Sequence, residues 1–317
     1  MSAIERLGID REAVFDCKKV SASQVQTRDA FDFKWSKRST YESPAMQENS
    51  RRWLYERYCG GKPDHLDEWL KGSPKIILDV GCGSGHSAIL LFGDHLKHHD
   101  YIGVDISGAV DVARVRFVER GYKGDFLRMD MCAAPIPDGS VDIIFAEGVL
   151  HHTDSTEKAF KHLSKKLRPG GRFLFYVYAR KSIIREFTDD FIRDKLKNMT
   201  DEDAWKAIEP LTRLGEALGN LKSTIEIPED IPLLDVKKGS YDVQRFFYWH
   251  VCKTYYRPEL TLDEMNHINF DWFRPLNCHR HTPEEISAWC CEAGMEIERM
   301  DVQKAGITVV AMKKESQ

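Results

Sequence analysis

The hydrophobic pattern of the chain is most regular between residues 75 and 178. Short runs of apolar and β-branched residues recur there, separated by polar or amphipathic segments. Runs of this length predict buried strands, and the spacing between them leaves room for helices. The predicted strands are 75–80, 100–105, 124–129, 141–146 and a fifth that ends at 178, with helices at 86–93 and 107–120. Strands that alternate with helices predict an α/β fold.

The pattern changes after residue 178 and returns near residue 281. Thr282 is followed by proline, by glutamate three residues on and by Gly294, the signature of a capped helix. Segments 295–302 and 306–312 then predict an antiparallel pair of strands at the sheet edge. The expected fold is a doubly wound, seven-stranded, mostly parallel sheet. Its predicted parts are an N-terminal helical segment (1–72), a core (73–179 and 281–317) and an inserted, aromatic-rich helical cap (180–280).

Composition and charge narrow the class of protein. The 317 residues are 42% hydrophobic and 30% charged, with a formal net charge of −4, which is ordinary for a globular protein. Nucleic-acid binding draws on clustered positive charge, so we expect no nucleic-acid partner. There is no leader-like start and no run of about 18 apolar residues, so we expect a cytoplasmic protein with no membrane partner. Eight cysteines without a C-x-x-C pair predict free thiols and no metal site.

The most distinctive stretch is the turn that follows the first strand. Asp79, Gly81, Gly83 and Gly85 occupy alternate positions there. Glycines at this spacing let the backbone turn sharply and approach a ligand closely. The spacing is neither the dinucleotide fingerprint nor a phosphate-binding P-loop. An acid two residues before the first glycine suits a cationic or hydroxyl-rich ligand better than a pyrophosphate.

This stretch resembles the first motif of class I S-adenosylmethionine (SAM) dependent methyltransferases. Three further features, in order, strengthen the resemblance: an acid at the end of the second strand, the phrase Pro-x-Pro-Asp-Gly-Ser-Val-Asp at 135–142, and Leu-Arg-Pro-Gly-Gly at 167–171. The similar region spans residues 75–178. An insertion after the fifth strand is similar to the plan of small-molecule methyltransferases.

The resemblance implies SAM as cofactor and assigns the residues that hold it. Asp79 and the three glycines would hold the methionine part, and Asp105 would accept both ribose hydroxyls. Asp130 would bind the adenine amino group, with Met131 beside the ring. Ile106 and Glu147, at the ends of the second and fourth strands, complete the expected cofactor set.

The reacting centre is expected where the fourth and fifth strands end. His151 or His152 is a candidate general base, because imidazole titrates near neutral pH. The alternative is a buried histidine that hydrogen-bonds the strand-end backbone. Tyr176 is the candidate for contact with the sulfonium through its π face.

Substrate contacts are expected from the N-terminal segment and the insertion. Phe31, Phe33 and Trp35 alternate and are predicted to share one face, either as a lid over the cofactor or as plain packing. Arg185, Asp189 and Arg193 share one helix face, either as surface ion pairs or with an arginine that binds a substrate carboxylate or phosphate. Tyr248 and His250 belong to the most aromatic segment and are predicted to line the substrate site.

The predicted activity is transfer of the methyl group of SAM to a small-molecule acceptor by in-line displacement, leaving S-adenosylhomocysteine. Two alternatives stay open. One is intramolecular cyclisation of SAM with release of methylthioadenosine, as in azetidine-2-carboxylate synthases with similar sequences. The other is a catalytically silent SAM-binding protein. The acceptor atom and the oligomeric state are not predicted.

Overall fold

The computed structural model describes residues 2–9, 20–62 and 64–315. Two compact units are formed. The first, called the sheet unit, comprises Met1–Trp35, Glu48–Ala179 and Asn277–Gln317. The second, called the helical unit, comprises Ser36–Gln47 and Arg180–Leu276. Each unit therefore contains segments that are far apart in the sequence.

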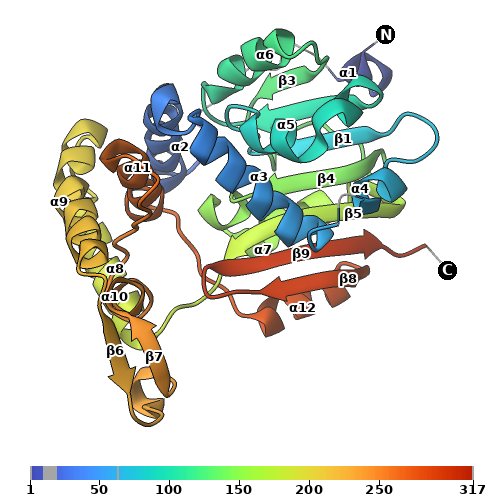
Figure 1. Ribbon diagram of the computed structural model, residues 1–317. Helices are drawn as coiled ribbons and strands as arrows, with labels where there is room; N and C mark the ends of the chain where they lie inside the picture. The colour runs from blue at the N-terminus through green and yellow to red at the C-terminus, as the bar shows by residue number, and fades with distance from the viewer. Residues whose placement is uncertain (1, 10–19, 63, 316–317) are drawn as a thin grey trace. The chain divides into compact units, whose positions relative to one another are not determined.

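The sheet unit is built on seven strands in the order β3-β2-β1-β4-β5-β9-β8 (Figure 1). Neighbours among the first five strands pair in parallel, whereas β9 pairs antiparallel with both β5 and β8. This confirms the predicted doubly wound, mostly parallel sheet. The strands are β1 (Ile76–Val80), β2 (Asp100–Asp105), β3 (Asp125–Arg128), β4 (Val141–Glu147), β5 (Leu167–Tyr178), β8 (Met295–Val302) and β9 (Gly306–Lys313).

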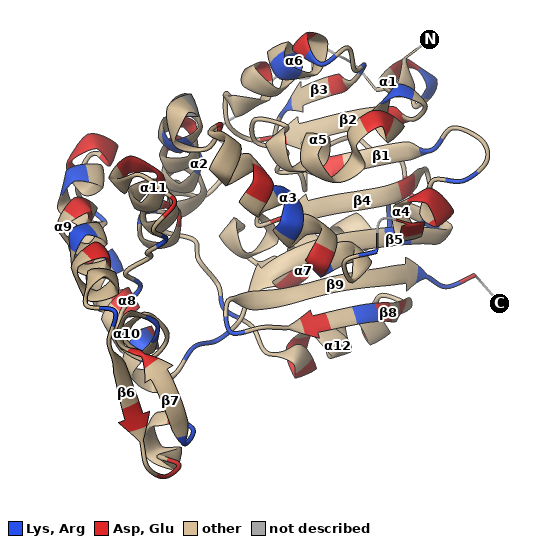
Figure 2. Cartoon of the chain, in the orientation of Figure 1, with Lys and Arg blue, Asp and Glu red and all other residues tan. Residues whose placement is uncertain are grey.

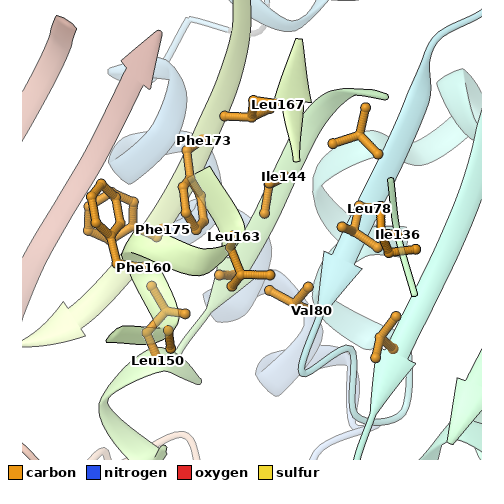
Figure 3. Close-up of a cluster of buried hydrophobic side chains, with 14 of the residues drawn as sticks. Leu78, Val80, Ile136, Ile144, Leu150, Phe160, Leu163, Leu167, Phe173 and Phe175 are labelled. Atoms are coloured by element: carbon orange, nitrogen blue, oxygen red, sulfur yellow. The ribbon is translucent and has the colours of Figure 1, made fainter. Parts of the chain in front are cut away.

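Helices cover both faces of this sheet, because successive strand residues point to opposite sides. Ile77 packs with one buried cluster and its neighbour Leu78 with the other. Figure 3 shows part of the second cluster, where Phe160 and Leu163 of α7 meet Phe173 of β5. One face is covered by α1 (Ala3–Arg6), α7 (Thr156–Ser164) and α12 (Pro283–Glu292). The other is covered by α3 (Pro44–Cys59), α4 (Asp64–Trp69), α5 (His86–Phe92) and α6 (Ala109–Glu119).

The helix ends follow the capping signals in the sequence. Thr282 caps α12, with its side chain accepting from the Glu285 amide and the Glu285 side chain accepting from the Thr282 amide. The predicted capping box is therefore confirmed. Short 3-10 segments, η3 (Gly93–Lys97) and η4 (Leu150–His152), complete the connections of the sheet unit.

Helix α2 (Ala22–Ser36) corrects one prediction. Residues two apart on an α-helix are turned by about 200°, whereas residues four apart lie on the same face. Phe31 and Trp35 therefore share a face of α2, and Phe33 points to the other side. The predicted common face for all three rings is wrong, because alternate positions align only in an extended chain.

The helical unit contains η2 (Arg38–Thr40), α8 (Ile183–Leu196), α9 (Asp201–Asn220), α10 (Val243–His250) and α11 (Leu262–Phe273). A two-stranded hairpin of β6 (Thr224–Ile227) and β7 (Gly239–Asp242), with η5 (Pro232–Leu234) at its tip, was not predicted. Buried polar side chains link α9 to α11. The Thr212 hydroxyl donates to Asn266 Oδ1 over 2.7 Å and accepts from Asn269 Nδ2 over 2.9 Å. These contacts satisfy polar groups that would be costly to bury alone.

Several chemical features were checked over the part of the chain that the structure describes. No helix in that part is both long and apolar enough to cross a membrane. No three His, Cys, Asp or Glu side chains in the described ranges come together as a metal site would require. No disulfide links the seven cysteines within those ranges, and Cys17 lies outside them.

Candidate functional site

The glycine turn between β1 and α5 is shaped by close packing. Gly81 has φ of +65° and Gly83 has φ of +50°, a region that residues with a Cβ seldom adopt. A Cβ on Gly81 would lie 2.1 Å from Cγ2 of Val149, and one on Gly83 would lie 3.0 Å from the Trp35 indole. The Gly81 amide donates to the Val104 carbonyl of β2 over 2.7 Å. Glycine is therefore required at these positions by conformation and by space.

Asp105, the last residue of β2, links the glycine turn to the segment after β2 through its two carboxylate oxygens. Oδ2 accepts from the Gly83 amide over 2.7 Å. Oδ1 accepts from the Ser107 amide over 2.8 Å and from its hydroxyl over 2.6 Å. Burial raises the pKa of Asp105, and these donors oppose the shift. The predicted acid at the second strand end thus lies directly beside the glycine turn.

Asp79 lies in β1 and is buried next to Tyr101 of β2. The Tyr101 hydroxyl donates to Asp79 Oδ2 over 2.6 Å. Burial raises the pKa of Asp79 to about 8, since the hydrogen bond from Tyr101 only partly offsets the loss of water and Asp105 and Glu147 add repulsion. A cation placed near this group would favour its ionised form.

Glu147, at the end of β4, is held by two residues of α3 that sequence analysis missed. Arg57 Nη1 and the Tyr58 hydroxyl both donate to the Glu147 carboxylate. The Arg57 guanidinium also lies 3.9 Å from the centre of the Tyr176 ring. Burial alone would lower the pKa of Arg57, but Glu147 and the neighbouring tyrosines raise it overall. Arg57 and Glu147 are 90 residues apart in the sequence, so no local pattern could pair them.

These groups surround one cavity of the sheet unit, which brings four predicted residues together: Trp35, Asp79, Gly81 and Glu147. Four lining residues were not predicted, namely Cys82, His86, Ser87 and Phe145. Trp35 was assigned to substrate binding, yet it packs on the glycine turn, because α2 is fixed there by the Gly108 amide, which donates to Asp32 Oδ1 over 2.5 Å. Trp35 thus lines this cavity, and its predicted role in substrate binding stays a prediction.

The other predicted cofactor residues lie at neighbouring strand ends. Gly85 precedes α5, and Ile106 follows Asp105 at the end of β2. Asp130 follows β3, and its Oδ1 accepts from the Cys132 amide over 2.7 Å. Met131 packs against the core. All the predicted cofactor positions thus lie at or near the carboxyl ends of β1 to β4, where open α/β sheets bind ligands.

The two histidines of η4 are packed among rings. Both are buried, and the His151 ring centre lies 3.8 Å from that of Tyr178. Nδ1 of His152 lies 2.6 Å from the Asn277 carbonyl oxygen, so it acts as the donor in this contact. Tyr176 packs its ring over Gly306 of β9 and against Arg57. His152 thus bonds a backbone carbonyl, although that of Asn277 and not one at a strand end, and the roles of both histidines and of Tyr176 at the reacting centre stay predictions.

Comparison with known protein families gives a direct result for the segment that forms the cavity. Residues 78–175 match a family described as a methyltransferase domain. These residues contain the glycine turn, Asp105, Asp130 and Glu147. This chain carries a class I SAM-dependent methyltransferase domain. The family resemblance of the motifs is thereby confirmed, and SAM is the cofactor of such a domain.

Relatives of the methyltransferase domain differ in what their names say they methylate. The tRNA (carboxymethyluridine(34)-5-O)-methyltransferase of Mus musculus is 32% identical over 179 residues, covering 55% of this chain and 24% of that protein. A methyltransferase of Claviceps purpurea is 29% identical over 216 residues, covering 64% of this chain and 60% of that protein. The chain thus spans a quarter to three fifths of the length of these relatives.

A solved structure shares the fold. Magnesium protoporphyrin IX methyltransferase from Synechocystis PCC 6803, with SAM bound, aligns with a TM-score of 0.50 at 13% sequence identity. The alignment covers 93% of this chain and 99% of that one. At this level of identity the likeness concerns the fold of the methyltransferase, and the acceptor has to be argued separately.

The remaining predicted substrate residues, Arg185, Tyr248 and His250, lie in the helical unit. Arg185 and Asp189 form an ion pair of 2.7 Å whose side chains are 1% and 2% exposed, so the interpretation as a surface pair is wrong. Arg185 Nη1 also donates to the Tyr248 carbonyl. Tyr248 and His250 are themselves mostly buried. The guanidinium of Arg185 is therefore engaged by its own unit, and its role in substrate binding stays a prediction.

Proposed function

We propose that this protein transfers the methyl group of SAM to a small-molecule acceptor. The observation that carries the proposal is the cavity in the methyltransferase domain, which is lined by Asp79, Glu147 and the first glycine of the turn. SAM carries a sulfonium and an ammonium group, and buried carboxylates favour cationic ligands. The residues present therefore fit SAM.

Different residues at this end of the sheet would bind different parts of the cofactor. Asp79 and Glu147 suit the ammonium end, since both carboxylates line the cavity. A carboxylate has about four acceptor sites, and Asp105 uses three of them for the Gly83 amide, the Ser107 amide and the Ser107 hydroxyl, so one site remains for a ribose hydroxyl. Asp130 and Met131 lie at the next strand end, where the adenine would follow.

Catalysis then depends on alignment and on the exclusion of water. SAM supplies a methyl group that the sulfonium already activates, so no covalent intermediate with the protein is required. The Trp35 indole and Phe145 ring supply apolar walls of the cavity. Tyr176, His151 and His152 lie where β4 and β5 end, and we assign them to the acceptor side of the reaction.

A small acceptor is favoured by the charge of the chain. The formal net charge is −4, and acidic and basic residues are interspersed along helices such as α9 (Figure 2). A nucleic acid would be attracted by a continuous basic surface instead. Because the Mus musculus relative is named as a tRNA methyltransferase, tRNA is included as an acceptor in the test.

The function is tested by product analysis. The purified protein is incubated with SAM alone, with a panel of small acids, amines and phenols, and with total tRNA. Acceptor-dependent S-adenosylhomocysteine in the small-molecule arm supports the proposal. S-adenosylhomocysteine formed only with tRNA would show that the acceptor is tRNA and not a small molecule. Methylthioadenosine formed from SAM alone would identify cyclisation. Absence of all products would support the silent SAM-binding alternative.

Asp105 provides the matching binding test. Replacing Asp105→Ala removes charge-assisted hydrogen bonds, each worth about 1.5–3 kcal/mol, so the Kd for SAM should rise on the order of 100-fold. Asp111→Asn is the control, because Asp111 is an exposed acid on α6 paired with Arg114. Calorimetric titration with SAM and S-adenosylhomocysteine measures both variants. Equal affinity in the Asp105 variant and the wild type would exclude this site as the cofactor site.

A further inference from the structure

The last turn of α3 carries two residues that reach the cavity of the sheet unit. Arg57 Nη1 donates to Glu147 Oε1, and the Tyr58 hydroxyl donates to Glu147 Oε2, each over 2.5 Å. Glu147 lines the cavity, and the side chains of Arg57 and Glu147 are 15% and 14% exposed. Each oxygen of this carboxylate therefore has one donor from α3 and keeps acceptor capacity for a ligand.

The sheet presents Glu147 on the face that α3 covers. Successive strand residues point to opposite sides, and Phe145, two residues before Glu147, packs in the same buried cluster as Tyr58. Tyr176 pairs with Glu147 across β4 and β5, so its ring lies on this face as well. Helix α3 can therefore reach the acid at the end of β4 because it packs on the same face of the sheet.

The guanidinium of Arg57 has a second contact, with Tyr176. Its central carbon lies 3.9 Å from the centre of the Tyr176 ring. A Cβ on Gly306 of β9 would lie 2.3 Å from that ring, and the φ of Gly306 lies outside the left-handed region, so space alone requires glycine there. Arg57 is thus oriented by a carboxylate and by an aromatic ring that is itself closely packed.

Arg299 of β8 fixes the turn that carries Arg57. Its Nε donates to the Arg57 carbonyl over 2.9 Å, and its Nη2 donates to the Glu56 carbonyl over 3.2 Å. The last carbonyls of a helix have no partner within the helix, so a cation at this end satisfies and stabilises them. A Cβ on Gly60 would lie 2.8 Å from Arg299 Nη1, so glycine leaves room for this contact.

Arg57 also adds a positive charge beside the two acids of the cavity. Burial raises the pKa of Asp79 to about 8, and repulsion from Glu147 contributes to this shift. The ion pair of Arg57 with Glu147 offsets that repulsion. Without Arg57, a largely buried carboxylate would lack its counter-charge, which favours turning away from the cavity or taking up a proton. Either change would weaken the attraction of Glu147 for a cation.

We propose that the end of α3 positions the acid that binds the ammonium group of SAM. Arg57 and Tyr58 hold the Glu147 carboxylate toward the cavity, and Arg299 holds the turn that carries them. The proposal rests on the proposed function, because it assigns Glu147 to that ammonium group. The three positioning residues lie outside the segment 78–175 that matches the methyltransferase family, so the cofactor site extends to both sides of that segment.

The test compares three ligands that differ in their amino-acid part. SAM and S-adenosylhomocysteine carry the ammonium group, whereas methylthioadenosine lacks the whole amino-acid part. Arg57→Met should raise the Kd of the first two ligands about tenfold or more, as loss of a charge-assisted contact predicts, and change that of methylthioadenosine less than about twofold. Arg57→Lys keeps the charge and should recover part of the affinity. Calorimetric titration measures all three ligands.

Two further variants and a control extend the test. Tyr58→Phe removes the second donor with little change of shape and should have a smaller effect with the same ligand selectivity. Arg299→Met leaves Arg57 in place and should weaken SAM binding about two- to fivefold, as loss of a charge at a helix end predicts. Arg52→Met is the matched control, because Arg52 is an exposed arginine of α3 that bonds Asn49. It should leave all three affinities unchanged.

A double-mutant cycle shows whether Arg57 acts through Glu147. Arg57→Met should weaken SAM binding much less in a Glu147→Gln background than in the wild type. Additive losses would show that Arg57 contacts the cofactor directly, and an equal loss for all three ligands would show a purely structural role. Either result, or unchanged affinity in the Arg57 variants, would overturn the proposal while SAM binding by the wild type is retained. A wild-type protein that binds neither SAM nor S-adenosylhomocysteine would overturn the proposed function as well.

Discussion

The two units bury charge of opposite sign and by different means. In the sheet unit, Asp79, Asp105 and Glu147 lie at or near the carboxyl ends of adjacent parallel strands. In the helical unit, four cations from α8 and from two connecting segments surround the Trp272 ring, namely Lys181, Arg185, Arg193 and Lys253, and Asp189 forms an ion pair with Arg185. A strand end is a fixed position that a local motif identifies. A cluster around one ring has no local signature.

The comparison also shows what each arrangement is suited to bind. The acids of the sheet unit share their cavity with a turn of glycines, so backbone and carboxylates together suit a cation with many polar atoms. The helical unit instead places guanidinium and ammonium groups around the Trp272 indole, and the face of an aromatic ring attracts such cations.

The largest effect is expected when the central acid of the helical unit loses its charge. Asp189→Asn keeps the size of the side chain but leaves Arg185 buried without its counter-charge, so the free energy of unfolding should fall by about 3–5 kcal/mol. Urea denaturation measures this loss. The control is Asp194→Asn on the same helix, whose exposed pair with Lys197 should contribute less than about 1 kcal/mol.

A second measurement sharpens this result. The double variant Arg185→Met with Asp189→Asn removes both partners and should recover part of the loss, because a buried charge without a partner costs more than an absent pair. Equal losses of stability in the Asp189→Asn and Asp194→Asn variants would show that the buried pair contributes no more than a surface pair.

A smaller loss is expected at the glycine turn of the sheet unit. Gly81→Ala places a methyl group 2.1 Å from Val149 Cγ2 at a φ of +65°. Overpacking costs about 1–3 kcal/mol and the left-handed conformation a further ~1–2 kcal/mol, so the free energy of unfolding should fall by about 2–5 kcal/mol and SAM binding should weaken. Thermal unfolding and SAM titration measure the two effects.

Gly139→Ala is the matched control for this substitution. Gly139 has a similar φ of +68°, but no heavy atom lies within 4 Å of its added Cβ, so only the conformational cost applies. Adding Val149→Ala to the Gly81 variant should relieve part of the clash. A Gly81 variant no less stable than the Gly139 variant would show that the turn is held by conformation alone.

The sequence predicted the regular part of the molecule well, and the reasons are local. The succession of strands and helices follows from alternating apolar runs, and the start of α12 follows from the capping box of Thr282. The glycine turn and Asp105 were predicted because the residues that identify them lie within about 25 positions of one another in the sequence. Patterns of this kind can be recognised without knowledge of the tertiary contacts.

The features that were missed depend on distant partners. Arg57 lies on an ordinary amphipathic helix, and only folding brings it to Glu147. The β6–β7 hairpin consists of two four-residue strands, and β6 is mostly exposed, so the hydrophobic pattern there is weak. The spacing of Arg185 and Asp189 fits a surface pair equally well. Their burial is set by Trp272 and Tyr248, which lie more than 60 residues further along the chain.

The pH dependence of stability is expected to depend on Asp79, one of the acids that line the cavity of the sheet unit. The pKa of Asp79 is raised to about 8, so the folded protein keeps this proton between about pH 4 and pH 8 while the unfolded chain releases it. The stability that this group contributes is therefore fully present below about pH 4 and is lost as pH rises to 8. Asp79→Asn should remove this part of the pH dependence, as measured by denaturation across the same range.

Binding of SAM should show the opposite slope. The cationic ends of SAM favour the ionised carboxylate of Asp79, so binding below pH 8 has to release its proton. Affinity should then increase by up to about tenfold per pH unit between pH 6 and pH 8, a limit of about 1.4 kcal/mol per unit. Asp79→Asn should bind SAM more weakly at pH 8 and lose the slope, while Tyr101→Phe should keep it. A wild-type affinity that is independent of pH, with no proton release in buffers of different ionisation enthalpy, would show that Asp79 does not face a cation of the ligand and would leave Glu147 as the acid that does.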